Sequence, residues 1–454
     1  MVSFTFQEVI DAVQPSLIKN EDAQAVFTGI STDTREIIAG SLFLALKGEN
    51  FDGHDFLAQA VEKGAAGIIA EKEPAGITEV PVFVAADSRE ALQGLARLHR
   101  LRYDIPVAAV TGSNGKTTTK DMLASVLKEK FQLIKTEKNL NNEIGLSKTL
   151  LQLNETHEAC VVEMGMRGFG QIRSLAATAL PTIGIVTNVG TSHIELLGSQ
   201  EGIAKAKGEL IEALPDNGVA VLNGDDPYVR AMHDKTKGKC IYYGIHGDAL
   251  DCWAEDIVYE GRETRFAFCT KDCRIDIQMP VSGEHNVYDA LAALSAAGEL
   301  GVSPEQMKAG LKAFQASPMR QELVRLGEVL FVNDAYNANP SSMEESLKAV
   351  KNMAEKRVIA VLGDMLELGD TAKAAHCHIG TVCRTLEIDG LITVGNMAKY
   401  IAEEAGDKVA CYAAKDHADA AEYLKSIVQK GDTVLLKGSR SMKMETVLAL
   451  FERM

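Results

Sequence analysis

The stretch TGSNGKTTTK, residues 111–120, has the composition of a loop that holds phosphates. It follows the apolar run IPVAAV and precedes a helical pattern, so the expected context is strand, glycine-rich turn and helix. Small residues in such a turn let consecutive backbone N–H groups converge on an anion, and the positive end of the helix dipole adds to the attraction. The residues expected to contact a nucleotide are Gly112, Ser113, Asn114, Gly115, Lys116, Thr117 and Thr118.

Two side chains of this loop have specific chemistry. Lys116 would neutralise the β- and γ-phosphates, and the Thr117 hydroxyl would hold Mg²⁺. The match to the pattern G-x-x-x-x-G-K-[ST] is incomplete, because Val110 stands at the first glycine position and Gly112 lies two residues later. The alternative is a plain turn with a solvated lysine. The agreement of strand, turn and helix favours a bound nucleotide and leaves the reaction open.

Polar residues also follow other predicted strands, where ligands gather in open α/β sheets. Glu163 ends the run CVVE, and its carboxylate is a hard ligand suited to Mg²⁺. A strand-end carboxylate that caps a neighbouring helix fits Glu163 almost equally well. His193 follows IGIVTN in the loop GTSHIELLG, and a loop histidine satisfied by backbone groups is the simpler interpretation. Asp334, Asp364 and Lys437 follow strands in the last third of the chain.

A lysine in the segment EGIAKAKGELIEAL has an unusual position. Taken as a helix, the segment places Lys207 in one apolar stripe with Ile203, Leu210 and Ile211, whereas Lys205 points to nearly the opposite side. An unpaired ammonium on a buried face is costly, so Lys207 should find a partner, lose its proton or be modified. The alternative is a side chain that extends its head to solvent, and the pattern does not choose between them.

Two further patterns predict no site. The run HCH at residues 376–378 resembles a metal-binding tract, but residues two apart on a helix do not face one another, which favours an ordinary amphipathic helix. Met164 and Met166 flank a glycine after a strand and are expected only to pack.

The elements that must position these residues alternate between strands and helices, which indicates βαβ units and mostly parallel sheets. A strand-rich patch at about 238–282 is expected to be an antiparallel extension. A chain of 454 residues exceeds one core, and about 150 residues per domain suggests about three domains. We expect an α/β protein with domains at 1–86, 87–315 and 316–454, the last break falling near Ser317-Pro318.

Composition excludes several classes of partner. The chain has 47 basic and 63 acidic residues and a net charge of −16, which argues against nucleic acid or an anionic membrane. The N-terminal residues carry no signal-peptide pattern, and no apolar run approaches the length of a membrane span. Eight scattered cysteines fit a reduced compartment, so we expect a cytoplasmic protein, and we expect it to be a monomer.

Taken together, these stretches resemble the Mur ligases, ATP-dependent amide-forming enzymes of peptidoglycan precursor synthesis. The resemblance spans nearly the whole chain in the order of the family. It is carried by STDTREIIAGSLFLALKGENFDGHDF, TGSNGKTTTK, EMGMRGFGQI, TNVGTSHIELLGS, AKAKGEL, GEHNVYDALAA, NDAYNANPSSM and GDMLELG. Within the family it is closest to the members that add D-alanyl-D-alanine to UDP-N-acetylmuramoyl-tripeptide.

The resemblance implies a domain for the UDP end of the substrate, a central P-loop ATPase domain and a mobile Rossmann-like C-terminal domain. It also implies ATP, one or two Mg²⁺ ions and a carbamate on Lys207. Metal positions are matched by Thr117, Glu163, His193 and Lys207. Asn286 matches an adenine-side asparagine, and Arg320 and Asp334 match residues that reach the phosphates and the ribose when the domains close. Lys116, Lys207, His193 and Arg320 would then be the catalytic residues.

For the substrates, the resemblance implies two groups of residues. The tripeptide substrate with its UDP end matches Ser31, Asp33, Thr34, Arg35, Lys47, Asp52, Gly53, His54 and Asn142, and the dipeptide side matches Asn337 and Asn339. One departure is visible, because Ser147 and Lys148 stand where the family pattern has proline and a less charged residue. The DNPR stretch of the ligases that add the third amino acid is absent, and GDMLELG is present instead.

The implied reaction transfers the γ-phosphate to the terminal carboxylate of the tripeptide, and the dipeptide amine then attacks the acyl phosphate. Two alternatives stay open at the level of sequence. One is another ligase of the superfamily, such as a folylpolyglutamate synthetase. The other is a non-catalytic nucleotide-responsive protein that keeps the fold.

Overall fold

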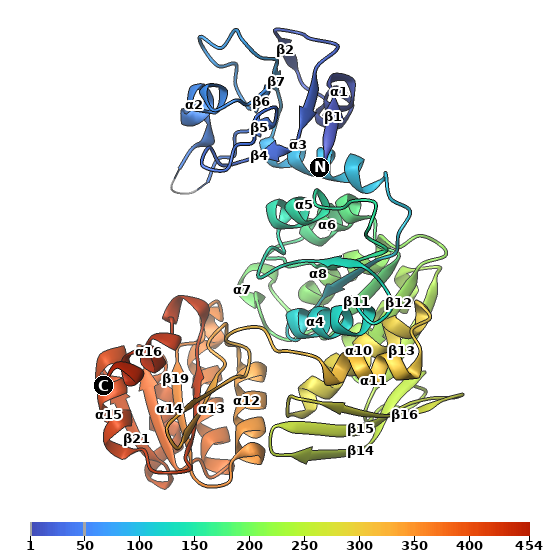
Figure 1. Cartoon of the computed structure of the whole chain (residues 1–454). Coiled ribbons are helices and arrows are strands. Elements are labelled where there is room, and N and C mark those ends of the chain that lie inside the picture. The colour runs from blue at the N-terminus through green and yellow to red at the C-terminus, as the bar shows by residue number, and fades with distance from the viewer. Residues whose placement is uncertain (1, 49–50) are drawn as a thin grey trace. The chain divides into compact units, whose positions relative to one another are not determined.

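The structure is a computed structural model that describes residues 2–48 and 51–454, so Glu49 and Asn50 of the predicted substrate stretch lie outside the described residues. Three larger sheets are built mostly from parallel strands joined by helices, which confirms the expected α/β class (Figure 1). The chain divides into two compact units. One comprises Met1–Ala109, Phe131–Met166 and Gln171–Thr182, and the other comprises Val110–Lys130, Arg167–Gly170 and Ile183–Met454.

The N-terminal part contains a five-stranded sheet of order β2-β7-β6-β5-β4, in which only the β2–β7 pair is antiparallel. A separate antiparallel pair, β1–β3, packs its buried Phe4 and Phe27 into the same core. The elements are β1 (Ser3–Thr5), α1 (Phe6–Val13), β2 (Leu17–Lys19), β3 (Val26–Thr28), β4 (Ile30–Ser31), β5 (Leu42–Leu44), α2 (Leu57–Glu62), β6 (Gly67–Ala70), β7 (Val82–Val84) and α3 (Ser88–Arg100).

The central sheet has the strand order β16-β15-β14-β13-β12-β11-β8-β10-β9. Its strands are β8 (Val107–Thr111), β9 (Leu133–Lys135), β10 (Ala159–Glu163), β11 (Ile183–Val186), β12 (Val219–Asn223), β13 (Lys239–Gly244), β14 (Cys252–Glu260), β15 (Glu263–Thr270) and β16 (Arg274–Met279). Its helices are α4 (Lys116–Leu127), α5 (Glu143–Leu150), α6 (Gln171–Ala179), α7 (Ile194–Leu197), α8 (Gln200–Glu212), α9 (Pro227–Arg230), α10 (Glu284–Glu299) and α11 (Pro304–Lys312).

The expectation of an antiparallel extension from about residue 238 is wrong for its first strand. β13 pairs in parallel with both β12 and β14, and only the β14–β15 and β15–β16 pairs are antiparallel. The reason is the crossover through α9, which returns the chain to the same end of the sheet before β13 begins.

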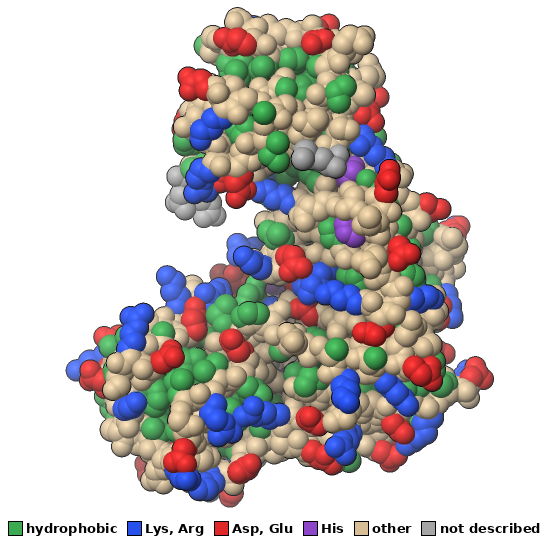
Figure 2. Space-filling model, in the orientation of Figure 1, with side chains coloured by type: hydrophobic (Ala, Val, Ile, Leu, Met, Phe, Trp, Pro, Cys, Tyr) green, Lys and Arg blue, Asp and Glu red, His purple; other side chains and the backbone are tan. Residues whose placement is uncertain are grey.

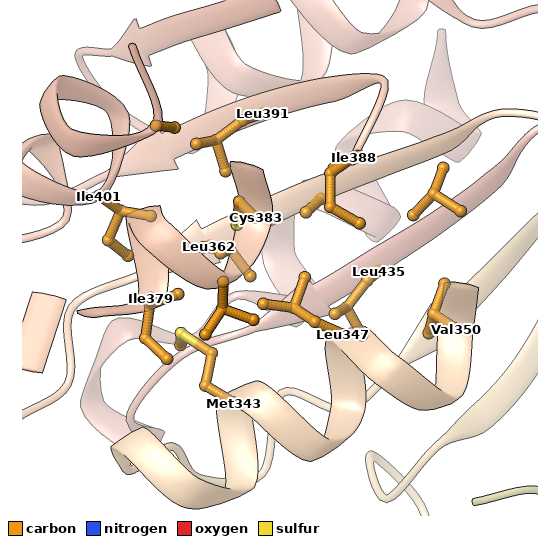
Figure 3. Close-up of a cluster of buried hydrophobic side chains, with 14 of the residues drawn as sticks. Met343, Leu347, Val350, Leu362, Ile379, Cys383, Ile388, Leu391, Ile401 and Leu435 are labelled. Carbon is orange, nitrogen blue, oxygen red and sulfur yellow. The ribbon is translucent and has the colours of Figure 1, made fainter. Parts of the chain in front are cut away.

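The C-terminal part is a six-stranded sheet of order β17-β18-β22-β19-β20-β21, antiparallel only at β17–β18. One face packs on α12, α13 and α14, where Met343, Leu347 and Ile379 meet the strand residues Leu362 and Leu435 (Figure 3). The other face packs on α15 and α16. The elements are β17 (Glu322–Leu326), β18 (Val329–Asn333), α12 (Pro340–Met353), β19 (Val358–Gly363), α13 (Ala372–Thr385), β20 (Gly390–Val394), α14 (Lys399–Ala405), β21 (Ala410–Ala414), α15 (His417–Ile427), β22 (Thr433–Lys437) and α16 (Glu445–Arg453).

Basic side chains form no continuous tract on the face shown in Figure 2, where blue and red groups are interspersed. No helix within the described residues combines the length and the apolarity needed to cross a membrane. All eight cysteines are free thiols.

Candidate active site

The predicted phosphate loop connects the buried strand β8 to helix α4. Gly115 is the N-cap of α4 with φ 80°, and a Cβ there would lie 2.2 Å from Oδ1 of Asp289. A Cβ on Gly112 would lie 1.8 Å from Oγ1 of Thr187. Only glycine fits these two positions, because the first needs a left-handed backbone and both lack space for a side chain.

The loop is held in place by the residues that follow β11. The backbone N–H of Ser113 donates to the Asn188 carbonyl at 2.9 Å, and that of Asn114 donates to Oδ1 of Asn188 at 2.9 Å. The Thr187 hydroxyl donates to the Asn114 carbonyl at 2.5 Å. No side chain caps the N-terminus of α4. A rigid turn in front of an uncapped helix N-terminus is the arrangement that binds phosphate.

Lys116 bends back over this loop. Its Nζ donates to the carbonyl oxygens of Gly112 at 2.8 Å and Ser113 at 3.2 Å. The same ammonium acts electrostatically on Lys207 and His193, lowering the pKa of each. The structure therefore brings three of the predicted catalytic residues together, and an anion beside them would favour the protonated forms of Lys207 and His193.

Lys207 lies on the buried face of α8, as the spacing predicted, and its side chain does not extend to solvent. It is 3% exposed, and Lys205 is exposed. Burial holds the pKa of Lys207 well below its usual value, and the charge of Lys116 lowers it further. Within the part of the chain that the structure describes, no group hydrogen-bonds to or forms an ion pair with its Nζ. Lys207 is therefore a buried amine whose pKa is held down by its surroundings.

His193 faces a carboxylate rather than backbone groups. It adopts a left-handed conformation with φ 63° immediately before α7, and its Nδ1 lies 2.8 Å from Oε2 of Glu367. Burial lowers the pKa of His193, and the Glu367 carboxylate opposes this shift. Glu367 belongs to the GDMLELG stretch, and two hydrogen bonds hold the backbone of this stretch. His376 accepts from the Met365 N–H, and the Ser439 hydroxyl accepts from the Leu366 N–H.

The HCH run forms no metal site. Nε2 of His376 accepts from the Met365 N–H, and its Nδ1 donates to the Ala372 carbonyl at 2.6 Å, which fixes a neutral ring. His378 points elsewhere and pairs with Glu344 at 2.8 Å. Among the described residues no three His, Cys, Asp or Glu side chains are grouped as a metal site.

Glu163 lies at the end of β10, in the other compact unit from Lys116. Its side chain is 2% exposed and accepts from Nδ2 of Asn141 at 2.8 Å. Its backbone N–H donates to the Thr136 hydroxyl at 3.1 Å. Asn141 was not predicted as a site residue. Its position in the loop just before helix α5 was the only feature of the sequence that could have indicated a site.

A buried carboxyl group beneath the phosphate loop was also not predicted. Asp289 on α10 is 5% exposed and accepts from the Thr119 hydroxyl at 2.9 Å. Burial raises its pKa to about 7, and the charges of Arg320 and Lys116 only partly oppose the shift. The motif GEHNVYDALAA contained this residue, but an acidic residue on an amphipathic helix carries no signal of burial.

The residues matched to the nucleoside lie around the start of the C-terminal sheet. The Arg320 guanidinium stacks over the Tyr336 ring at 4.1 Å from its centre. Asp334 at the end of β18 pairs with Lys437 at 2.5 Å and accepts from the Ser346 hydroxyl at 2.6 Å. Asn286 and Asp334 both bond to Gln321, a residue that sequence reasoning missed.

The two residues matched to the dipeptide differ in burial, since Asn339 is buried and Asn337 is exposed. Asn339 caps α12, and its Nδ2 donates to Oδ1 of Asn114 at 2.6 Å and to the Ser192 hydroxyl at 2.7 Å. Asn337 is exposed, and its carbonyl accepts from Lys437. A cavity of about 430 Å³ lies beside Asn339, and it is lined by Asn114, Asn188, Val189, Gly190, Thr191, Gln200, Asp226, Pro340, Ser341, Glu344 and His378.

The residues matched to the UDP end form two tight turns in the N-terminal part. In the first, Asp33 accepts from the backbone and side chain of Arg35, which lowers the pKa of Asp33, while the Ser31 hydroxyl donates to the Asp33 carbonyl. The Thr34 hydroxyl donates to Gln59 at 2.8 Å. The Arg35 side chain is 84% exposed and is therefore available to a ligand.

In the second turn, His54 donates from Nδ1 to Asp52 at 2.5 Å and accepts at Nε2 from the Glu71 N–H. A Cβ on Gly53 would lie 2.8 Å from the Leu46 backbone. The backbone of Lys47 pairs with that of Asp52 in an isolated antiparallel β-bridge, and Lys47 is exposed.

Asn142 caps α5 through Oδ1, which accepts from the Gly145 N–H at 2.9 Å. Its side chain therefore has a local structural role, and its Nδ2 group is the part that could reach a ligand.

Comparison with known proteins finds three family domains in the same order along the chain as the N-terminal, central and C-terminal sheets. Family models match for the Mur ligase family catalytic domain at residues 26–100, the Mur ligase middle domain at 110–297 and the Mur ligase glutamate ligase domain at 319–440. The UDP-N-acetylmuramoyl-tripeptide–D-alanyl-D-alanine ligase of Bacillus subtilis is 37% identical over 459 residues, covering 99% of this chain and 98% of the relative.

Solved structures agree along the whole chain. A crystal structure of MurF from Acinetobacter baumannii is similar with a TM-score of 0.92 and 31% identity, and all of both chains is covered. MurF ligase from Thermotoga maritima, solved in complex with ADP, has a TM-score of 0.85 and 31% identity, covering 93% of this chain and 97% of that one.

Proposed function

This chain belongs to the Mur ligase family, and on that premise we propose that it joins D-alanyl-D-alanine to UDP-N-acetylmuramoyl-tripeptide, with hydrolysis of ATP to ADP and phosphate. The observation that carries the proposal is the phosphate loop at Gly112–Gly115 together with the buried amine of Lys207, whose pKa is lowered by burial and by the charge of Lys116. The product belongs to peptidoglycan precursor synthesis, and the protein acts as a cytoplasmic monomer.

The reaction has two steps. An oxygen of the terminal tripeptide carboxylate attacks the γ-phosphorus, and ADP leaves, giving an acyl phosphate. The dipeptide amine then attacks the acyl carbon, loses a proton, and the tetrahedral intermediate expels phosphate to leave the amide. Negative charge spreads over the transferring phosphoryl oxygens, so Lys116 and Arg320 would act by electrostatic stabilisation.

The donors of this chain suit Mg²⁺. The Thr117 hydroxyl and the Glu163 carboxylate are hard oxygen ligands, and His193 would contribute its imidazole. The amine of Lys207 can add CO₂ and release a proton, which turns it into a carbamate anion and gives a further oxygen ligand. One or two bound Mg²⁺ ions would supply Lewis-acid neutralisation of phosphate and acyl oxygens.

The substrates would be divided among three domains with bounds 1–86, 87–315 and 316–454. The first would hold the UDP end through the turns around Asp33 and His54, with Asn142 following. The C-terminal domain would bring Arg320 and Asp334 to the nucleotide and present the dipeptide beside Asn337 and Asn339. Domain closure would exclude water from the acyl phosphate.

Release of inorganic phosphate from the purified protein tests the proposal. The protein is given ATP, Mg²⁺ and D-alanyl-D-alanine with UDP-muramyl-tripeptide ending in either L-lysine or meso-diaminopimelate. We expect phosphate release with at least one tripeptide and only when the dipeptide is present. Phosphate release with a folate and glutamate instead would indicate a folylpolyglutamate synthetase, and no release with any acceptor would indicate a non-catalytic nucleotide-binding protein.

A further inference from the structure

The amide of Asn286 has only one possible orientation. One of its terminal atoms lies 2.8 Å from the carbonyl oxygen of Ser282, which can only accept a hydrogen bond. That atom must therefore be the donor Nδ2. Asn286 is buried at the start of α10, so the assignment also fixes where its Oδ1 lies.

Gln321 completes a network around this amide. Its Oε1 accepts from Nδ2 of Asn286 at 3.1 Å, because Nδ2 is already identified as a donor. Its Nε2 then lies 3.0 Å from Nε2 of His285, which must be the acceptor of the pair. With Nε2 as the acceptor, a neutral His285 ring carries its proton on Nδ1. Burial lowers the pKa of His285. Each orientation follows from the one before, starting at the Ser282 carbonyl.

The network leaves one group of Asn286 uncommitted. Within residues 2–48 and 51–454, Nδ2 is used by protein acceptors, and no protein group donates to Oδ1. We propose that Gln321 is a positioning residue that sets nucleobase specificity, because it locks Asn286 so that only a hydrogen-bond acceptor faces the base. This inference rests on the proposed function and on the match of Asn286 to an adenine-side asparagine.

An acceptor discriminates between purines when it faces position 6 of the base, which is the edge that this inference assigns to Asn286. There the 6-amino group of adenine donates to a carbonyl oxygen, whereas the 6-oxo group of guanine would place two acceptors together. Asn286 could accommodate guanine only by turning its amide over. The turned amide would set Oδ1 against both the Ser282 carbonyl and Oε1 of Gln321, so the network opposes the rotation.

Gln321 also connects the base residue to the ribose residue. Its backbone N–H donates to Oδ1 of Asp334 at 3.2 Å, while its φ of 52° lies in the left-handed region that a glutamine seldom adopts. Asp334 is fixed in turn by Lys437 and Ser346. The strained backbone of Gln321 is therefore held by contacts on both sides, and its side chain reaches α10 from the segment that precedes β17.

The test compares three variants by their affinities for ADP and GDP, measured by calorimetry, and by kcat/KM for ATP and GTP. Gln321→Ala removes the lock, and we expect its preference for adenine over guanine to fall about tenfold or more. Gln321→Glu keeps an oxygen that accepts from Asn286, so it should retain the preference. Gln315→Ala is the matched control, because Gln315 is an exposed glutamine of the same linker.

A Gln321→Ala variant that folds and keeps the wild-type preference overturns the inference. Equal losses of ADP and GDP affinity in that variant also overturn it, because a lock on the amide must act on the ratio. Failure of Gln321→Glu to retain the preference, while Gln315→Ala retains it, counts against the acceptor role as well. These outcomes differ from failure of the proposed function, in which the wild-type protein itself would bind no adenine nucleotide and release no phosphate.

Discussion

Lys207 occupies an environment that a charged lysine avoids, and this makes it the most informative single residue of the chain. It is buried, it has no partner among the described residues, and Lys116 lies near enough to lower its pKa. Packing alone does not account for a lysine at this position, since burying an unpaired amine is unfavourable. Its position near the loop lysine fits a role as a modified metal ligand.

Replacement of Lys207 by alanine should therefore nearly abolish ligation without unfolding the protein. Addition of a short carboxylic acid should restore part of the activity, because a free carboxylate can take the place of the carbamate. Lys205→Ala, on the exposed side of the same helix, is the control and should keep full activity. If the acids restore nothing in a folded Lys207→Ala protein, the carbamate is excluded.

Asp289 gives a prediction about pH. Its pKa is raised from 3.8 to about 7 in the folded protein, so between these values the folded state holds a proton that the unfolded state has lost. The free energy of unfolding therefore falls as the pH rises from about 4 to 7, and Asp289 accounts for a decrease of at most roughly 4 kcal/mol. Asp289→Asn keeps the acceptor for Thr119 but cannot ionise.

Thermal unfolding of Asp289→Asn and of wild type at pH 5 and pH 8 measures this effect. The variant should gain stability relative to wild type at the higher pH. A difference between the two proteins that stays constant with pH would show that Asp289 is already ionised in the folded state.

For single residues, the sequence predicts those features that depend only on the pattern of neighbouring residues in the chain. The loop lysine and the stripe position of Lys207 are local patterns. The burial of Lys207 is confirmed, and the role of the loop lysine stays a prediction. The contacts of Glu367, Asn141 and Gln321 could not be predicted, because each residue meets a partner in a distant segment. Periodicity carries no information about such pairs.

Among the elements, the turn between β8 and α4 leaves no room for a side chain at Gly115. Gly115→Ala would force an alanine into a left-handed conformation and against Asp289. We expect ADP affinity to fall by at least about tenfold, because the loop N–H groups would shift from their positions around the phosphates. Gly298→Ala, near the end of α10 where a Cβ meets only Met307 at 3.7 Å, should bind ADP like wild type. Equal ADP affinities for the two variants would show that the turn does not shape the nucleotide site.

The C-terminal sheet depends on the packing of α12 against its strands. Leu347 is fully buried in the cluster of Figure 3, and Leu347→Ala should cost about 2–5 kcal/mol of stability through lost contacts and a residual cavity. Lys348→Ala removes an exposed neighbour on the same helix and should cost less than about 1 kcal/mol. Denaturant unfolding measures both values, and similar losses in the two variants would contradict this account of the core.

Sequence pattern recovered most elements, and the reason for its failure is visible at β13. Alternation of residues identified the strand, but the direction of pairing depends on the path of the preceding crossover. Strand direction is therefore a property of the connection rather than of the strand residues.

For the whole molecule, the order of motifs along the chain predicted three α/β parts, and the matches to three Mur ligase family models follow the same order. The segment between α11 and β17 is linked to the phosphate-loop helix by the Ser317 hydroxyl, which donates to Asp121 at 2.6 Å. Arg320 follows three residues later. A motion at this segment would couple the position of Arg320 to that of the loop, which sequence alone could not indicate.

The central claim is that the terminal carboxylate of the tripeptide is activated by phosphorylation. The most direct test supplies wild-type protein with ATP, D-alanyl-D-alanine and a tripeptide substrate whose terminal carboxylate carries ¹⁸O in both oxygens. Mass spectrometry of the released phosphate should find one ¹⁸O atom in each molecule, and Lys116→Ala should release almost none. Unlabelled phosphate formed together with the new amide would contradict the acyl-phosphate mechanism.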